Sequence, residues 1–349
     1  MMILAEMARE EHVFDWAAAV AATHARNSPR RLFMLVYFVG IVVTALLSND
    51  ATAVVLTPAV LAVVRRARVE PKPYLLACAL IANAASFIFP ISNPANLVVF
   101  DRQIPPLFDW LGIFLLPSIA SVLLTYSCLR WHSRKQLRGR IEGIVQQAPL
   151  STEGKLALAG LIVAAAALIV SSAFGLPLGA PTCGAAILAL IVVASRNRKI
   201  VPSVARGVSW SVLPLVAGLF VIVEALHNAG LLRAGLAGLG ALAPTSAWVA
   251  KGGSALAAAL LSNGMNNLPV GLMAGAAIRS AHESGVVAHA MLIGVDLGPN
   301  LSVTGSLATI LWLIALRREK VEITAWEFFK VGIFAMPLAL IASLLVLRG

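Results

Sequence analysis

Charged residues are scarce in this sequence. Asp, Glu, Lys and Arg together make up 12% of its 349 residues, about half the share expected of a soluble domain. Apolar residues make up 59% and lie in long runs, few of which contain a charge. This composition excludes a soluble enzyme, a disordered protein and a nucleic-acid-binding domain. It indicates an all-α polytopic membrane protein.

Motifs for catalysis and metal binding are missing as well. The sequence contains no HExxH, Walker A or GxSxG motif, which argues against a membrane protease, an ATPase or a lipase. We therefore expect neither enzyme activity nor a cofactor. The three cysteines, Cys78, Cys128 and Cys183, lack the spacing of a metal site or a disulfide framework. Most of the six histidines fall in loops or at helix ends, where solvated structural roles are expected.

The net charge is nonetheless +11, and its basic residues lie in clusters between the apolar runs. In a membrane protein, orientation by the positive-inside rule explains such clusters better than nucleic-acid binding does. That rule assigns all five clusters to the cytoplasmic side. They are Arg26/Arg30/Arg31, Arg65/Arg66/Arg68/Lys72, Arg130/Arg134/Lys135/Arg138/Arg140, Arg196/Arg198/Lys199 and Arg317/Arg318/Lys320.

Several apolar runs are too short to cross a bilayer, which takes roughly 20 helical residues. Two short pairs are interrupted by polar residues, Ser48-Asn49-Asp50 in the first and Ser262-Asn263-Gly264 in the second. Because both flanks of the first pair are basic, we predict a re-entrant hairpin that opens to the cytoplasm. Continuing this topology makes the second pair a hairpin that opens to the outside. The apolar runs are 32–47, 51–64, 74–100, 107–130, 155–173, 182–195, 209–228, 252–261, 265–278, 287–316 and 327–347.

The order of these features repeats along the chain. Each hairpin follows an apolar segment with a glutamate, Glu6 or Glu224, and precedes a long helix interrupted by polar residues and a proline, at 92–97 or 296–302. This order predicts inverted repeats with two re-entrant helical hairpins and two interrupted transmembrane helices.

The repeat also predicts how the chain divides. Residues 1–131 form an incomplete first repeat, 132–154 a basic cytoplasmic linker, and 155–349 a second repeat that begins with three further helices. Since the first repeat has no counterpart of those helices, we expect the chain to lack roughly 2–3 helices at its N-terminus. A natural short form is the alternative.

The interruptions predict a binding site. A broken helix frees backbone groups, which persist within a membrane only where they line a cavity or pack in protein. Amide and hydroxyl side chains add donors and acceptors for a small hydroxylated or anionic solute. The alternative is that these side chains only satisfy the breaks. The predicted lining is Ser48, Asn49, Asp50, Thr52, Ser92, Asn93 and Asn96 from the first half, and Ser262, Asn263, Asn266, Asn267, Asn300, Ser302 and Thr304 from the second.

Four acidic residues lie within apolar stretches: Glu6, Asp50, Glu224 and Asp296. Acids inside a membrane are costly and usually have a partner or a function. Asp50 at a hairpin tip and Asp296 beside an interrupted helix are the better candidates for carrying protons. Glu6 and Glu224 are candidates for the same role or for bonding between helices.

Three segments resemble the ArsB-type arsenite efflux permeases of the ion transporter superfamily: 47–58 (LSNDATAVVLTP), 261–269 (LSNGMNNLP) and 294–306 (GVDLGPNLSVTGS). The sequences of the hairpin tips also resemble dicarboxylate and NhaD-type sodium/proton transporters. The segment from 294 through Arg317-Arg318 is the more specific signature of the ArsB-type permeases.

The resemblance implies export of arsenite or antimonite across the inner membrane, coupled to proton entry, and allows an ArsA-type ATPase as a partner. It places substrate or proton handling on Asn49, Asp50, Thr52, Asn93, Asn96, Asn263, Asn266, Asn267, Asp296 and Asn300. We expect oxygen and amide groups to hold the metalloid, because a site of three thiolates would hold it too tightly for turnover. A sodium/proton or dicarboxylate transporter of the same superfamily and an inactive truncated form are the alternatives.

Overall fold

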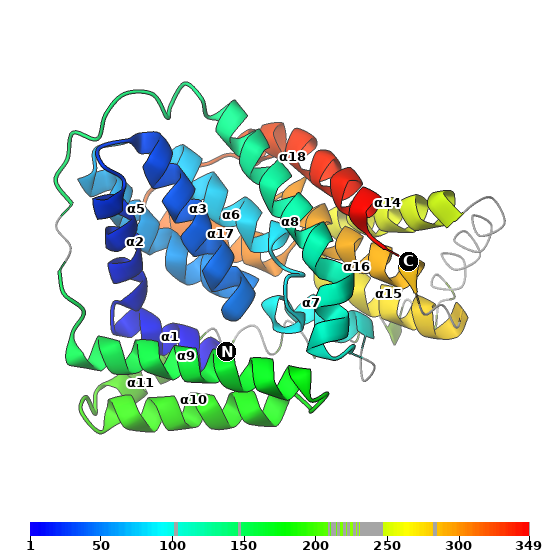
Figure 1. Cartoon of the computed structure of the whole chain (residues 1–349), viewed down its shortest axis with the longest axis horizontal. Helices are drawn as coiled ribbons and strands as arrows, with labels where there is room; N and C mark the ends of the chain where they lie inside the picture. The colour runs from blue at the N-terminus through cyan, green and yellow to red at the C-terminus, as the bar shows by residue number, and fades with distance from the viewer. Residues whose placement is uncertain are drawn as a thin grey trace.

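A computed structural model of the chain describes residues 1–100, 104–145, 148–208, 210, 247–281 and 285–348, with single positions between 214 and 230. These residues form helices and no strands, which confirms the predicted all-α fold class (Figure 1). The helices are α1 (Met2–Glu10), α2 (Val13–His24), α3 (Pro29–Leu46), α4 (Asn49–Ala51), the π-helical turn η1 (Thr52–Leu56), α5 (Thr57–Arg66), α6 (Lys72–Ala84), η2 (Pro90–Ser92), α7 (Pro94–Phe100), α8 (Leu107–His132), α9 (Thr152–Ala173), α10 (Gly179–Ala194), α11 (Ile200–Gly207), α14 (Ala247–Met265), α15 (Asn267–Ala281), α16 (Val286–Leu297), η3 (Gly298–Asn300), α17 (Leu307–Arg318) and α18 (Ala325–Val346).

Four of the described helices are long and apolar enough to cross a membrane: α3, α8, α9 and α18. Helix α10 is apolar but shorter, and it packs along α9 at one edge of the molecule (Figure 1). Large apolar side chains such as Phe38, Ile162 and Leu345 point outward from α3, α9 and α18 and are at least 60% exposed. An apolar outer surface of this kind suits contact with lipid.

The two ends of the first hairpin lie on one face. The N–H of Ile141 donates to the carbonyl of Asn27, just before α3, and the N–H of Gly143 donates to the carbonyl of Ala67, just after α5, both at 3.1 Å. The Tyr74 hydroxyl of α6 also donates to Pro29 O (3.0 Å). A re-entrant path brings its entry and exit together in this way, whereas a single crossing would separate them.

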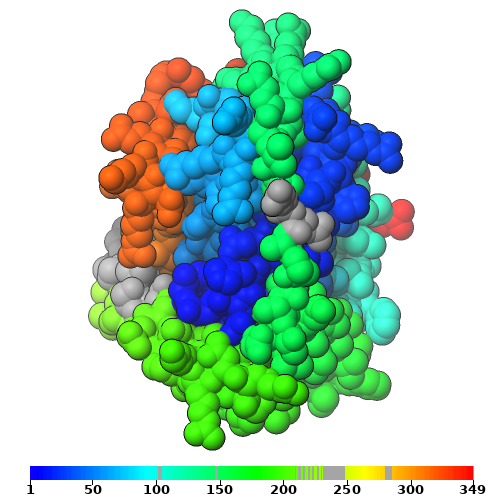
Figure 2. Space-filling model, turned by 90° about the vertical axis from the view of Figure 1, so that its left-hand side faces the viewer, coloured from blue at the N-terminus to red at the C-terminus, as the bar shows by residue number. Residues whose placement is uncertain are grey.

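The segments that carry the basic clusters gather on this same face. Figure 2 shows the dark blue N-terminal helices, the light blue connection from α5 to α6, the green linker after α8 and the orange end of α17 next to one another. Ion pairs join Arg65 to Glu319 (3.3 Å) and Lys72 to Glu327 (2.7 Å) across this face. We call it the basic face. Its assignment to the cytoplasm, and the division at 131 and 155, stay predictions.

Small residues bring the second hairpin against the second interrupted helix. Helices α14 and α16 run in parallel, and a Cβ atom on Gly294 or Gly298 would lie 2.1 or 2.4 Å from the carbonyl oxygen of Ala255 or Ala259. Gly-xxx-Gly facing Ala-xxx-Ala allows two helix backbones to approach closely within a membrane. This contact positions Asp296, which lies between the two glycines.

The break in the second hairpin lies at Asn266, whereas we expected it at Ser262-Asn263-Gly264. Helix α14 continues through Met265 because Ser262 Oγ and Asn263 Nδ2 donate to the helix's own carbonyls at Ala258 (2.8 Å) and Ala259 (2.7 Å). Asn266 instead adopts a left-handed conformation (φ 76°), which asparagine tolerates better than most residues.

The first interrupted helix breaks earlier than expected. Helix α6 ends at Ala84, and the irregular stretch reaches to Asn93. Helix α8 compensates, because Ser121 Oγ donates to the carbonyl of Ala84 (2.9 Å) and Trp110 Nε1 to that of Phe87 (3.1 Å). The short helices α1, α2 and α11 were not among the expected apolar runs. Most of the expected run 209–228 lies outside the described residues.

Candidate functional site at the helix breaks

The two interrupted helices are joined by a buried pair of asparagines. Asn83 Nδ2 donates to Asn300 Oδ1 (3.0 Å), and Asn300 Nδ2 donates to the carbonyl of Leu80 (3.1 Å). The Ser306 hydroxyl donates to Asn83 Oδ1 (3.2 Å). Asn83, Asn300 and Ser306 are fully buried. This network connects the end of α6 in the first half to the break between η3 and α17 in the second.

Asp296 lies beside this network with half of its carboxylate unpartnered. Asn93 Nδ2 donates to Asp296 Oδ1 (2.7 Å), and Asn93 Oδ1 accepts from the N–H of Ala95 (3.0 Å). Asp296 is fully buried, and its Oδ2 has no hydrogen-bond partner in the described part of the chain. Buried polar atoms are nearly always bonded. Oδ2 is therefore a place where a proton or a ligand hydroxyl could bind.

The second hairpin contributes a further set of polar groups. Asn263 Nδ2 donates to the carbonyl of Gly298 (3.0 Å), while Asn263 Oδ1 accepts from the Ser302 hydroxyl (2.6 Å). Thr304 Oγ1 donates to the carbonyl of Asn263 (3.1 Å). The N–H of Asn267 donates to Gly305 O (2.8 Å), and Asn267 Nδ2 is buried without a partner among the described residues. The hairpin tip thus docks onto the break that follows Asp296.

The first hairpin tip is capped and wound tightly. Ser48 Oγ accepts from the N–H of Ala51 (3.2 Å) and Asn49 Oδ1 from that of Asp50 (2.9 Å). Thr52 begins the π-helical turn η1, and its hydroxyl bonds with that of Thr44 (2.8 Å). Single π-helical turns often occur at functional sites. Asp50 is half-buried.

Ser92 links the two first-half breaks, since its hydroxyl donates to the carbonyl of Ala45 at the end of α3 (3.0 Å). The tip segment α4 also contacts α17, which Ser306 caps, and α6, which carries Asn83. Asn96 Nδ2 donates to the carbonyls of Ser86 (2.8 Å) and Phe89 (3.3 Å). The four breaks therefore meet around one buried polar region, which we call the polar centre.

Most of the predicted site residues take part in this region, but Ser262 and Asn266 contribute mainly to their own hairpin. The Ser262 hydroxyl bonds within α14, and Asn266 Oδ1 accepts from the N–H of Leu268 (3.3 Å).

The three cysteines lie on three helices, α6, α8 and α10. Among the described residues no group of three or more His, Cys, Asp or Glu side chains could hold a metal ion.

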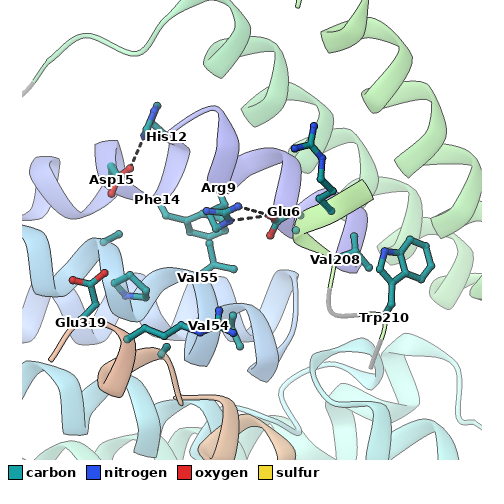
Figure 3. A pocket seen from close by; sticks show the side chains of 16 residues that line it. Glu6, Arg9, His12, Phe14, Asp15, Val54, Val55, Val208, Trp210 and Glu319 are labelled. Carbon is teal, nitrogen blue, oxygen red and sulfur yellow. Dashed lines mark hydrogen bonds and ion pairs between the residues drawn. The ribbon is translucent and has the colours of Figure 1, made fainter. Parts of the chain in front are cut away.

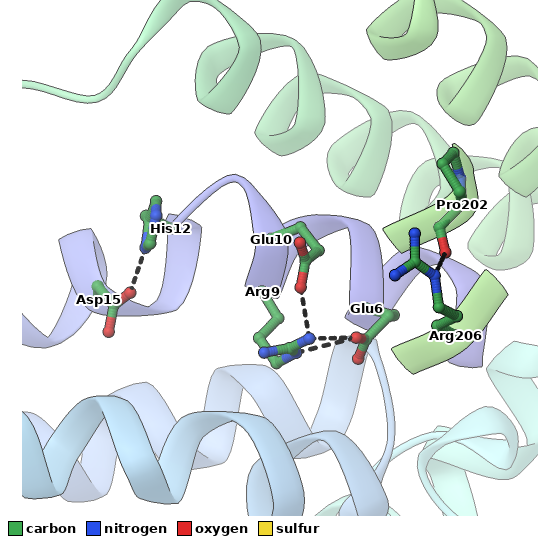
Figure 4. A network of polar contacts seen from close by, with 7 residues as sticks. All are labelled: Glu6, Arg9, Glu10, His12, Asp15, Pro202 and Arg206. Carbon is green, nitrogen blue, oxygen red and sulfur yellow. Dashed lines mark hydrogen bonds and ion pairs between the residues drawn. The ribbon is translucent and has the colours of Figure 1, made fainter. Parts of the chain in front are cut away.

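Glu6 lies elsewhere, at a cavity of about 640 Å³ lined by α1, α2, η1, α5, α11 and α17 (Figure 3). Its Oε1 accepts from Arg9 Nε (3.0 Å) and Nη2, and Arg9 also pairs with Glu10 (Figure 4). The Glu6 carboxylate packs so closely on Gly207 that a Cβ atom there would overlap it. An ion-paired and tightly packed carboxylate favours the bonding role over the proton-carrying role for Glu6.

Glu224 is among the described residues and is exposed. Its Oε1 accepts a hydrogen bond from Asn228 Nδ2 (3.4 Å). Its surroundings lie largely outside the described residues, so its role stays a prediction.

Asn83 and Ser306 are members of the polar centre that sequence analysis did not select. Asn83 is an isolated polar residue in the apolar run 74–100, and that isolation was the available signal. Ser306 also caps α17, where Ser306 and Thr309 bond reciprocally. Capping alone would explain Ser306, so its bond to Asn83 could not be foreseen.

Broken helices that meet at a buried polar centre are the architecture of many secondary membrane transporters. The sequence pattern of the citrate transporter family (CitMHS) matches residues 1–298. The chain is 31% identical to the arsenical pump membrane protein of Escherichia coli (strain K12) over 350 residues. This alignment covers 95% of this chain and 80% of the relative. The Yersinia enterocolitica protein of that name is 30% identical, with the same coverage.

The chain belongs to the citrate transporter family, and its relatives identify it as an ArsB-type permease. Its fold is similar to the crystal structure of the Alcanivorax borkumensis YdaH transporter, described as having an unusual topology. The TM-score is 0.54 at 18% identity, over 99% of this chain and 82% of that one. At this identity the likeness concerns the fold alone.

Proposed function

We propose that this permease exports arsenite or antimonite across the inner membrane and couples that export to proton entry by alternating access. The observation that carries the proposal is the chemistry of the polar centre. It consists of amides, hydroxyls and one buried carboxylate, and the break segments 47–52, 83–96, 263–267 and 296–309 contain no Lys or Arg. The arsenical pump relatives support the same cargo.

Arsenite suits such a centre because at neutral pH it is mostly uncharged As(OH)₃, a compact triol. Amide and hydroxyl groups both donate and accept hydrogen bonds, so they replace the water around a triol without fixing a charge. The dispersed cysteines on α6, α8 and α10 offer no thiolate trap. Exchangeable hydrogen bonds allow the release that turnover requires.

Asp296 is a better proton carrier than Asp50, the other leading candidate for that role. Its Oδ2 is buried and unpartnered, whereas Asp50 is half-buried at a hairpin tip. Protonation of Asp296 neutralises a charge between helices that pack backbone to backbone, and so changes the relative stability of the two access states. The membrane potential adds about 2.3 kcal/mol per 100 mV for each charge that crosses.

The direct test is arsenite accumulation in cells that lack their own arsenite efflux. Cells that express the chain should accumulate less arsenite than cells with an empty vector, and a protonophore should abolish the difference. An equal accumulation with and without the chain, at confirmed membrane expression, would contradict the proposal.

A carboxylate cargo is the second candidate, because the family is described as citrate transporters. A site for a di- or tricarboxylate would be expected to supply cationic side chains or sodium sites, and the break segments contain neither Lys nor Arg. Everted vesicles offered labelled arsenite, citrate, succinate or sodium would separate the candidates. We expect arsenite alone to accumulate in an energy-dependent way.

We also propose that a soluble ArsA-type ATPase is a partner and that it docks on the basic face, where most of the basic clusters gather. Co-purification from detergent at low and high salt tests this, since contacts through exposed charges weaken as salt screens them. Failure to co-purify at low salt would contradict the partner but not the transport function.

A further inference from the structure

His289 on α16 has an unusual environment for a histidine. The residue is half-buried, and its Nδ1 is buried without a hydrogen-bond partner in the described structure. Its ring lies 6.1 Å from that of Phe100 on α7 and 5.5 Å from that of Phe114 on α8, centroid to centroid. The imidazole therefore extends from the protein surface into an aromatic cluster, with one nitrogen facing inward and unsatisfied.

Helices α7 and α16 run in opposite directions, and two contacts fix their register. Asn93, just before α7, bonds to Asp296 near the end of α16. At the other end Phe100 of α7 lies against His289. Asn96 stands between Asn93 and Phe100, on the face of α7 that both of them share.

Three buried side-chain atoms without partners belong to these two neighbouring helices: His289 Nδ1 and Asp296 Oδ2 on α16, and Asn96 Oδ1 on α7. The seven residues from His289 to Asp296 span about 10 Å of helix. Packing alone does not explain three unpaired polar atoms on two helices in contact, because buried polar atoms are nearly always bonded.

We propose that His289 is the residue through which protons reach Asp296 from the face opposite the basic face. This inference rests on the proposed proton coupling. Nε2 of His289 takes a proton from water at the surface, and the imidazolium releases its Nδ1 proton inward. Water held by Asn96 Oδ1 passes the proton to Asp296 Oδ2. A half-turn of the ring about its Cβ–Cγ bond then brings the protonated nitrogen inward and the bare nitrogen to the surface, which resets the path.

The charged groups on the helices next to His289 either bond to other residues or are exposed to the surface. Lys251 of α14 donates to the carbonyl of Leu347 (3.0 Å) and lies over the Trp248 ring. Arg279 of α15 lies beside Gly275, and Asp109 of α8 is exposed. Helix α7 has no titratable residue. Among the described residues Asp296 is thus the acid to which His289 can pass a proton.

The transport test compares two modes of exchange. In right-side-out vesicles loaded with labelled arsenite, net efflux into acidic medium requires proton entry, whereas exchange of internal for external arsenite does not. We expect His289→Gln and His289→Phe to lower net efflux at least about tenfold, because positioned proton-transfer groups contribute ~10²–10⁴-fold to the steps that they serve. Exchange should stay within twofold of the unmodified chain. The control is His24→Gln, at an exposed position on α2, which should change neither.

The outcomes separate the two proposals. Retained net efflux in both His289 variants would overturn the proton path and leave the arsenite function intact. An equal loss of net efflux and exchange would also overturn it, since that pattern indicates a structural role. Absence of both modes in the unmodified chain would refute the arsenite function instead.

A second measurement does not depend on arsenite. Diethylpyrocarbonate modifies neutral histidine, so the pH profile of His289 modification, read by mass spectrometry on purified protein, reports its protonation. If His289 and Asp296 are coupled, Asp296→Asn removes a nearby negative charge and should lower the midpoint pH by about one unit at ~10 Å separation. An unreactive His289, or an unchanged midpoint, would overturn the proposal whatever the cargo.

Discussion

At the scale of single residues, Asp296 combines full burial, one strong hydrogen bond from Asn93 and one free oxygen. Asp296→Asn keeps the shape and an oxygen that can accept from Asn93, but it cannot take up a proton. We therefore expect proton-driven arsenite efflux to be lost while arsenite exchange persists. Transport in the vesicles described above checks this, and Asp50→Asn is the matched comparison.

The comparison also decides between the two acids. If Asp50→Asn loses proton-driven efflux while Asp296→Asn retains it, the first hairpin tip is the proton carrier and Asp296 only supports the break. Both variants should have the same Tm as the unmodified chain within a few degrees, since neither substitution alters the volume of the side chain.

Asn83 provides the residue-scale prediction for stability. Asn83→Leu leaves Asn300 Oδ1 and the Ser306 hydroxyl without their partners from α6. Polar contacts between membrane helices contribute about 1–2 kcal/mol at most, so we expect a lower Tm in detergent. Ser127→Ala is the control, because its exposed hydroxyl bonds only within α8, to the carbonyl of Leu123. An unchanged Tm for Asn83→Leu would show that the asparagine pair does not hold the two halves together.

This pair also marks a limit of sequence analysis at the residue scale. Ser48, Asn93, Asp296 and Asn300 could be selected because each lies at an interruption of an apolar run. Asn83 bonds to a residue 217 positions away, and no local pattern specifies that partner. The polar centre was predictable as a collection of residue types, whereas its pairings depend on tertiary packing.

At the scale of elements, hydrophobic run length predicted the helices α3, α8, α9 and α18 to within a few residues. It placed the first hairpin break correctly at Ser48, because serine there caps the next turn. It misplaced the second break because Ser262 and Asn263 bond back to their own helix. Polar side chains interrupt an apolar run equally well in both cases, and only the local hydrogen bonding distinguishes a break from a continuous helix.

The close packing of α14 on α16 gives a prediction at this scale. Gly294→Ala would place a Cβ atom 2.1 Å from the carbonyl oxygen of Ala255, so the helices must separate. Overpacking of this kind costs about 1–3 kcal/mol, and it also displaces Asp296 two residues away. We expect a lower Tm together with reduced arsenite exchange.

Gly184→Ala on α10 is the matched control, because nothing lies within 4 Å of a Cβ atom there. Alanine favours a helix over glycine by up to about 1 kcal/mol, so this change should leave the Tm equal or slightly higher. If both variants unfold at the same temperature, the α14–α16 approach is not a tight contact.

At the scale of the whole molecule, the arrangement depends on both ends of the first hairpin lying on the basic face. Hydrogen bonds from Ile141 and Gly143 hold these ends to one stretch of the linker. The ion pairs of Arg65 and Lys72 join the same region to Glu319, just after α17, and to Glu327, in the first turn of α18. Exposed pairs of this kind contribute little individually. The backbone hydrogen bonds and the buried polar centre therefore stabilise the position of the hairpin more than the ion pairs do.

Labelling of single cysteines tests this arrangement in the membrane. In a background without Cys78, Cys128 and Cys183, a cysteine at the exposed positions Arg31 or Arg65 should react with an impermeant maleimide only after the cells are permeabilised. A cysteine at Leu176, which is 54% exposed between α9 and α10, should react in intact cells. The reason is that basic segments stay on the cytoplasmic side, while the connection 174–178 carries no charge. Labelling that places Arg31 and Arg65 on different sides would turn the hairpin into a crossing helix, which would separate its tip from the second interrupted helix and remove the polar centre.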